Sequence, residues 1–77
     1  MSNQVEIASL DDIGLYIRST RLGYTVSQSL LSEISGVTRA TISNLENGKV
    51  ENVKWSTIEK LLKTLKTKII LVDTLQE

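Results

Sequence analysis

Apolar residues recur at helical spacing along most of this 77-residue chain, which contains no proline. In the segment SLDDIGLYIRSTRLGY, one face is formed by residues three or four positions apart, namely Leu10, Ile13, Ile17 and Thr20. Positions at this spacing share one side of an α-helix, so the segment predicts an amphipathic helix. Ser9 is suited to cap its first turn, and Asp12, three positions later, completes a variant of the capping box.

Two short helical segments follow, divided by Gly36. The first, SQSLLSEIS, has Ser27 or Thr25 as a suitable N-cap. Its apolar residues Leu31 and Ile34 are expected to face inward. Gly36 suits the left-handed turn that ends many helices, because glycine adopts a positive φ without a Cβ clash.

The second short segment, RATISNLEN, is capped by Thr38 and ends at Gly48. Its large apolar residues Ile42 and Leu45 are three positions apart and, with Val37, would anchor the helix from one side. The other side carries Arg39, Ala40, Ser43, Asn44 and Asn47. None of these is an aliphatic residue larger than alanine. Short polar side chains and one arginine on an exposed helix suit entry into the major groove of DNA.

A fourth helix is predicted in VENVKWSTIEKLLKTLK, with an apolar stripe of Ile58, Leu61, Leu62 and Leu65. Trp55, near its start, is expected to cover the core rather than to serve as a ligand platform. Residues 54–68 contain five lysines and one glutamate, whereas residues 1–12 contain three acids and no base. The lysines form either a basic face on a neutral chain or an ordinary solvated helix surface.

The segment TKIILVDT differs from the rest of the chain, because four apolar residues follow one another directly: Ile69, Ile70, Leu71 and Val72. This run predicts a buried strand. A lone strand leaves its backbone unpaired, and residues 4–7 are a weak partner, so we expect the same strand of a second copy to pair with it antiparallel about a two-fold axis. Burial would contribute at most about 1.5–3 kcal/mol per side chain. A frayed tail or a fifth helix is the alternative.

Composition excludes several kinds of chemistry. Basic and acidic residues balance at nine each, and the chain contains no cysteine and no histidine. Disulfides, thiolate metal sites and the commonest general base are therefore absent. Asp11 and Asp12 are adjacent at a helix start and point apart, so no carboxylate pair is suited to catalysis. We expect neither an enzyme nor a metal or cofactor site.

Nothing in the sequence predicts a membrane protein or a secreted one. No apolar run approaches the roughly 18 residues that a membrane-spanning helix needs. The start of the chain, MSNQVEIASLDD, has neither the basic residues nor the apolar stretch of a signal peptide. A cytoplasmic protein is expected and, if it binds DNA, one associated with the nucleoid.

The stretch SQSLLSEISGVTRATISNLENGK has the order of a helix-turn-helix. It resembles the phage repressor and Cro-type family, also called the Xre family. The pattern is a glutamine, a leucine with a small residue, glycine-aliphatic-Ser/Thr, Ile-Ser and finally Glu-Asn-Gly. In addition, NVKWSTIEKLLKTLKTKIILVD is similar to the last helix and C-terminal strand of HipB-type antitoxins. Together the two resemblances cover roughly residues 10–73.

This resemblance implies a mostly α fold. Residues 1–8 would be a flexible segment, residues 9–66 a four-helix repressor-like helix-turn-helix domain, and residues 67–77 a strand and tail that pair between two subunits. It also implies site residues. Base edges would be contacted by Thr38, Arg39, Ala40, Ser43 and Asn44. Phosphates would be contacted by Ser27, Gln28, Asn47 and Lys49. Arginine suits guanine and asparagine suits adenine.

Arg21 and Glu46 match a family ion pair that ties the first helix to the end of the third. One departure affects this pair. The family usually places a glycine three residues before the glutamine, where this chain has Thr25, and Gly23 comes two residues early. Either the first helix runs through Gly23, at about 1 kcal/mol relative to alanine, or it ends there. In the second case its register shifts and Arg18 would replace Arg21.

Leu15 and Leu22 lie opposite the expected core face of the first helix. They are either scattered exposed residues or a surface for a protein partner. The leading hypothesis is a homodimeric repressor that binds an inverted repeat in double-stranded DNA. The resemblance to HipB-type proteins implies an antitoxin that also binds a HipA-like toxin kinase. The alternatives are a phage or plasmid repressor without a toxin, and a subunit that inhibits a partner without specific DNA binding.

Overall fold

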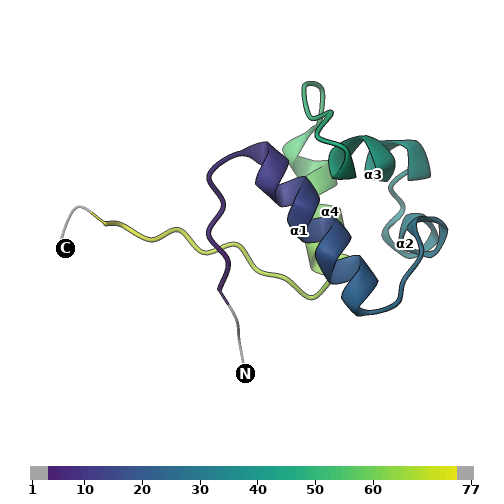
Figure 1. Ribbon diagram of the computed structural model, residues 1–77, viewed down its shortest axis with the longest axis horizontal. Coiled ribbons are helices and arrows are strands. Elements are labelled where there is room, and N and C mark those ends of the chain that lie inside the picture. Colours follow the sequence, from purple (N-terminus) through teal and green to yellow (C-terminus); the bar gives the residue numbers. More distant parts are fainter. Residues whose placement is uncertain (1–3, 75–77) are drawn as a thin grey trace.

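Four helices pack around one small core in the computed structural model, which describes residues 4–74 (Figure 1). They are α1 (Leu10–Gly23), α2 (Gln28–Ser35), α3 (Arg39–Glu46) and α4 (Trp55–Thr64). No strand is formed within the described part of the chain. Residues 1–3 of the expected flexible segment and residues 75–77 of the expected tail lie outside it. The mostly helical, helix-turn-helix part of the prediction is confirmed.

The core is aliphatic and closely follows the predicted stripes. Its buried side chains are Ile17, Leu31, Val37, Ile42, Leu45, Ile58, Leu61, Leu62 and Leu65. Seven of them come from the four helices, whereas Val37 lies in the turn between α2 and α3 and Leu65 directly follows α4. α1 packs on α3, and α2 packs on both α3 and α4. Because each buried aliphatic side chain contributes about 1.5–3 kcal/mol relative to exposure, this cluster is the main source of stability.

Three residues that we expected to face the core are exposed, and the first is Leu10, which is 40% exposed at the start of α1. Ile34 is 61% exposed, because the side of α2 next to Leu31 that faces α3 carries polar residues instead. Gln28 donates to Glu46 of α3 on that side, and Ser35 Oγ accepts from the N–H of Val37 at 3.2 Å. Trp55 is 52% exposed, because it is the first residue of α4 and the aliphatic residues after it already close the core.

The end of α1 settles where the first helix stops. Gly23 is the last residue of α1, and the N–H of Tyr24 still donates to Thr20 O at 3.1 Å, so helical hydrogen bonding runs through Gly23. Thr25 then adopts a left-handed conformation with φ +56°. Two backbone bonds of 3.0 Å close a Schellman motif, from the N–H of Val26 to Arg21 O and from the N–H of Thr25 to Leu22 O. Thr25 therefore occupies the conformation in which the family places glycine. The family register is retained and the longer connection is excluded.

Gly14 has a packing role that the sequence pattern did not reveal. It lies on the face of α1 that packs against the end of α3, and it is buried. A Cβ atom at this position would lie 1.9 Å from the carbonyl oxygen of Leu45. The backbones of α1 and α3 therefore approach each other at a distance that only glycine permits.

The chain beyond α4 runs away from the helices as an extended tail (Figure 1). A hydrogen bond of 2.8 Å between Tyr16 Oη and Thr67 Oγ1 holds its start against α1. The four apolar residues that follow are exposed, from 47% for Ile69 to 93% for Leu71. Residues 4–74 form no strand ladder, so pairing of this segment between two copies stays a prediction.

Candidate DNA-binding surface

The turn between α2 and α3 is built from local signals. Ser27 Oγ caps α2 by accepting from the N–H of Leu30 at 3.0 Å. Gly36 ends α2 with φ +80°, which reverses the chain. Thr38 Oγ1 then caps α3 by accepting from the N–H of Thr41 at 3.2 Å. Both N-caps match the sequence prediction, with Ser27 rather than Thr25 as the cap of α2.

α3 has two distinct sides. Its inner side buries Ile42 and Leu45 completely, at 0% and 1% exposure. Its outer side presents the residues predicted to contact bases, namely Thr38, Arg39, Ala40, Ser43 and Asn44. All of them are exposed except Ser43, which is half-buried. The structure therefore brings the predicted base-contacting residues together on one solvent-facing side of a helix.

The residues predicted to contact phosphates flank this side. Ser27 and Gln28 lie at the N-terminus of α2, and Asn47 and Lys49 follow the end of α3. Asn47 Nδ2 donates a weak 3.4 Å hydrogen bond to Ser43 Oγ on the preceding turn. All four residues therefore lie at the edges of the α2–α3 unit.

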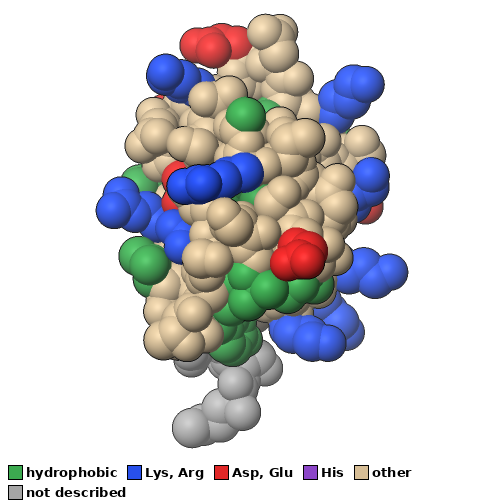
Figure 2. Space-filling model, turned by 90° about the vertical axis from the view of Figure 1, so that its right-hand side faces the viewer, with side chains coloured by type: hydrophobic (Ala, Val, Ile, Leu, Met, Phe, Trp, Pro, Cys, Tyr) green, Lys and Arg blue, Asp and Glu red, His purple; other side chains and the backbone are tan. Residues whose placement is uncertain are grey.

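The electrostatics of the helix starts favours anions at this unit. The first turns of α2 and α3 contain no acidic residue, whereas the first turn of α1 contains Asp11 and Asp12. The N-terminus of a helix carries a partial positive charge, which acidic side chains neutralise. The starts of α2 and α3 therefore keep their affinity for phosphate. Figure 2 shows the face that carries these helices, with lysine and arginine side chains spread around and across it.

A buried ion pair locks this unit to the rest of the fold. Arg21 Nε and Nη2 donate to the two carboxylate oxygens of Glu46, each at 2.8 Å. Arg21 Nη1 also donates to the carbonyl oxygen of Val26 at 2.9 Å, and Gln28 Nε2 donates to Glu46 Oε1 at 3.0 Å. The predicted Arg21–Glu46 pair is thus formed, and the substitute Arg18 is not used. The pair joins α1, α2 and α3 at one point.

The ionisation of this pair follows from its contacts. Burial of the Glu46 carboxyl favours its neutral form, but the hydrogen bonds from Arg21 and Gln28 favour the carboxylate more. The pKa of Glu46 therefore lies below its ordinary value. The hydrogen bond to Glu46 raises the pKa of Arg21 despite its burial. Both groups stay charged at neutral pH, and no buried side-chain N or O atom of the described residues lacks a partner.

Large apolar side chains of α1 and α2 are exposed. Leu15 and Leu22 are 59% and 53% exposed, as their position opposite the core predicted. Sequence reasoning missed Leu30, which is exposed on α2 together with Ile34. Their spacing of four positions was the signal for a second face on this helix. In Figure 2 hydrophobic side chains form a continuous area in the lower part of the face that carries α2 and α3.

Within the described residues, no helix has the length and apolar character that crossing a membrane requires. Comparison with curated protein sequences gives no match.

Solved structures resemble this chain over nearly its whole length. A chain in a structure described as "Structure of HipA-HipB-O2-O3 complex" is 31% identical, with a TM-score of 0.81, and the match covers 92% of this chain and 99% of that one. A chain in "HipB(S29A)-O2 20mer complex" is 28% identical, with a TM-score of 0.83, over 94% and 99% of the two chains. A structure described as "MDT Protein" is 30% identical, with a TM-score of 0.81, over 92% and 99%.

A family description agrees with these structures. The Cro/C1-type HTH DNA-binding domain matches residues 23–70, which include α2, α3 and α4. The match begins at the last residue of α1 and ends within the apolar run of the tail. The expected resemblance to HipB-type proteins is confirmed. The chain belongs to the Cro/C1-type helix-turn-helix DNA-binding domain family.

Proposed function

We propose that this protein is a transcriptional repressor that binds an inverted-repeat operator as a homodimer and serves as the antitoxin of a HipBA-like operon. The observation that carries the proposal is the two-sided α3, buried by Ile42 and Leu45 and polar on its exposed side. The proposal places the protein in the cytoplasm, associated with the nucleoid, and assigns it no enzymatic activity.

Specific binding rests on the exposed side of α3. Arg39 lies at the first helical position, where recognition helices meet base edges. Its guanidinium suits the two acceptors of a guanine, and the methyl of Ala40 suits a thymine methyl. Asn44, about one turn further along, is placed to reach an adenine or a phosphate.

Affinity would come mainly from phosphate contacts. Gln28 is the best-positioned contact, because its bond to Glu46 fixes the amide and leaves its second N–H hydrogen for a phosphate. Lys49 adds a positive charge beyond the end of α3, where it is exposed. Each phosphate that is neutralised releases counterions, so we expect binding to weaken steeply as salt increases.

Dimerisation would set the spacing of the operator. Two copies joined through Ile69–Val72 would present their α3 helices to half-sites about 34 Å apart, one turn of B-DNA. The exposure of all four tail residues supports this arrangement, because a single chain leaves them uncovered.

The antitoxin role rests on similarity. One of the matched solved structures, at 31% identity, is a complex that contains HipA as well as HipB. A HipA-like toxin kinase would be the protein partner here, and exposed Leu15 and Leu22 are candidates for its contact surface. The first alternative is a stand-alone repressor, which would bind DNA through the same residues but would have no toxin partner. A subunit that inhibits a partner without specific DNA binding is the competing class.

A titration of DNA fragments separates these possibilities. The protein is titrated against the inverted repeat upstream of its own gene and against a scrambled fragment at moderate salt, by fluorescence anisotropy. We expect a clear preference for the repeat. Arg39→Ala should lose about 1–3 kcal/mol on the repeat, roughly 5- to 150-fold, and relax one base position. Lys49→Ala should weaken binding to all sequences alike. Equal affinity of the wild type for both fragments would remove the repressor role.

A further inference from the structure

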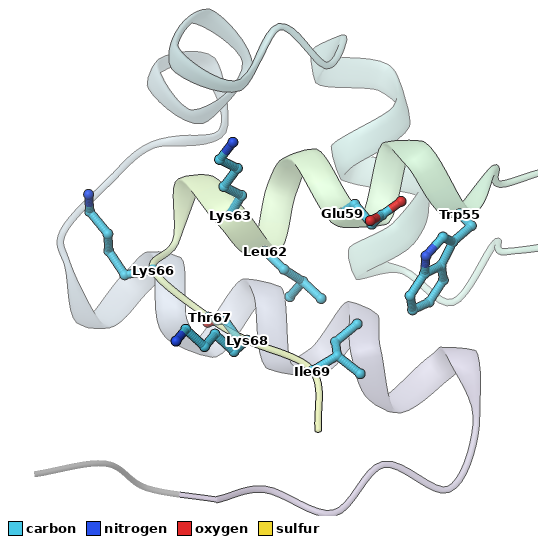
Figure 3. A pocket seen from close by; sticks show the side chains of 8 residues that line it. All are labelled: Trp55, Glu59, Leu62, Lys63, Lys66, Thr67, Lys68 and Ile69. Carbon is cyan, nitrogen blue, oxygen red and sulfur yellow. The ribbon is translucent and has the colours of Figure 1, made fainter. Parts of the chain in front are cut away.

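A groove lies between α4 and the start of the tail, with a volume of about 560 Å³ (Figure 3). Its apolar lining is Trp55, Leu62 and Ile69, and its rim includes Lys63 and Lys66. Leu62 and Ile69 point toward one another, and the indole of Trp55 lies at one end (Figure 3). Lys63 and Lys66 extend away from these apolar side chains. The groove is therefore an apolar recess beside the chain segment that we expect to pair.

The lining of this groove is incompletely covered. Trp55 is 52% exposed and Ile69 is 47% exposed, although Leu62 beneath them is 5% exposed. Among the residues that the structure describes, none fills the remaining space. A tryptophan and an isoleucine exposed side by side form an apolar surface that suits an apolar side chain from another molecule.

The tail itself carries a side chain of the required kind. Successive side chains of an extended chain point to opposite sides, so Leu71 lies on the same side as Ile69. Ile70 lies on the other side. Leu71 is 93% exposed, the highest value among the large apolar residues described. Leu71 therefore points to the same side as the groove but does not line the groove of its own chain. It is placed to enter the groove of a second copy.

Symmetry limits how two tails can pair. In an antiparallel pair with a two-fold axis normal to the ladder, one residue lies opposite its own copy. A pair centred on Ile70 places Leu71 of one copy opposite Ile69 of the other, on the groove side. Their Cβ atoms would then be about 4.5–5.5 Å apart. A pair centred on Leu71 would instead place the carboxylate of Asp73 opposite Ile69, on an apolar surface that penalises charge.

We propose that the two tails pair about Ile70, and that the groove beside Trp55 in each copy receives Leu71 of the other copy. This inference rests on the proposed dimer and adds its register and the site that each tail occupies. It also gives the exposed indole of Trp55 a function, because the indole forms one wall of the partner-binding groove. Leu71 of each subunit thereby covers the apolar groove of the other subunit.

Cysteine cross-linking tests the register, because the chain has no cysteine of its own. Single variants Ile69→Cys, Ile70→Cys and Leu71→Cys are oxidised mildly and scored for disulfide dimers on a denaturing gel. A disulfide requires Cα atoms about 4.4–6.8 Å apart, which only the central pair of residues satisfies with its own copy. We expect Ile70→Cys to cross-link at least tenfold faster than the other two variants. Faster cross-linking of Leu71→Cys would overturn the proposed register.

Charge substitutions test the groove. Leu71→Asp should weaken dimerisation at least tenfold by light scattering and shift the emission of the single tryptophan to longer wavelength. Val72→Asp is the matched control, since it adds the same charge on the opposite side, across from Lys68 of the second copy in this register. Because Val72 also belongs to the pairing strand, this variant should weaken dimerisation too, but less than Leu71→Asp does, and the tryptophan emission of the remaining dimer should not shift. Far-UV circular dichroism checks that both variants are folded.

The outcomes distinguish the groove from the dimer. If the wild type is monomeric at tens of micromolar, the proposed dimer and this inference both fail. If the wild type is a dimer but Leu71→Asp matches Val72→Asp in affinity and in tryptophan emission, only the groove assignment fails. A dimer weakened more by Leu71→Asp than by Val72→Asp, with a tryptophan emission shifted in Leu71→Asp alone, supports both.

Discussion

Replacing Gly14 by alanine should destabilise the fold, although alanine favours helices. The added Cβ would lie 1.9 Å from Leu45 O, whereas contacts below 3.0 Å are essentially never found. The backbones of α1 and α3 must therefore separate by about 1.1 Å, which loosens the packing of Ile17 and Leu45. Overpacking of this kind costs about 1–3 kcal/mol, and the gain in helix propensity offsets at most about 1 kcal/mol. Because backbone rather than a flexible side chain is displaced, we expect the net loss near 2 kcal/mol.

Gly23→Ala is the matched control on the same helix. No atom lies within 4 Å of a Cβ built at Gly23, and the residue still has helical hydrogen bonding. This variant should be unchanged or more stable by up to about 1 kcal/mol. Urea unfolding followed by circular dichroism at 222 nm, at one fixed protein concentration, measures both variants. If Gly14→Ala and Gly23→Ala are equally stable, the close approach of α1 and α3 does not limit this position.

Three further predictions concern stability. Glu46→Gln should cost about 3–5 kcal/mol at pH 7, because Arg21 is left as a buried charge without its counterion. Because folding lowers the pKa of Glu46, its ionised carboxylate contributes fully to the free energy of unfolding above about pH 4.5, the pKa of this group in the unfolded chain. This contribution declines as the pH falls below that value. Urea unfolding from pH 7 to 3 should therefore show that the difference in free energy of unfolding between wild type and Glu46→Gln decreases only below about pH 4.5. A difference that stays constant down to pH 3 would contradict this explanation. Thr25 and Lys66 both have positive φ, +56° and +59°, and the second also ends a Schellman motif, in which the N–H of Thr67 donates to Leu62 O and the N–H of Lys66 to Lys63 O. Thr25→Gly and Lys66→Gly should therefore each raise the free energy of unfolding by about 0.5–1 kcal/mol, whereas Tyr24→Gly, at φ −87°, should lower it. Leu31→Ala should lower the free energy of unfolding by about 2–5 kcal/mol and Ile34→Ala by less than about 0.5 kcal/mol, because Leu31 is buried and Ile34 is exposed. Similar losses in the two variants would show that Ile34 is buried.

The sequence predicted the features that depend on local interactions. The caps at Ser27 and Thr38 and the left-handed Gly36 each follow from a bond or a φ angle within a few residues. The helical stripes were equally predictable, because a 3.6-residue period depends only on spacing. The outward set on α3 followed from the same period, since the side opposite Ile42 and Leu45 is fixed once these are buried.

Other features depend on which elements meet, and spacing alone does not contain that information. Gly14 is required by the carbonyl oxygen of Leu45, which is 31 positions away in sequence. Ile34 is exposed because Gln28, which donates a hydrogen bond to Glu46 of α3, occupies the α3-facing side of α2. Thr25 could not be resolved from sequence, because the left-handed conformation penalises threonine and the family pattern has glycine there. The ladder of the tail requires a second copy, so a single chain neither forms nor excludes it.

The buried pair also links the interior of the fold to its DNA-binding surface. Glu46 accepts hydrogen bonds both from α1, through Arg21, and from α2, through Gln28. Gln28 is also the predicted phosphate contact, so the carboxylate that stabilises the core orients the side chain that faces DNA. A change at Glu46 should therefore weaken binding to every sequence alike, because the disturbed contact is made to a phosphate. A change at Arg39 should act on one base position. Arg39 and Glu46 lie on the same helix, seven positions and about two turns apart. The difference between them follows from their burial, because Arg39 is exposed at the start of α3 whereas Glu46 is buried at its end.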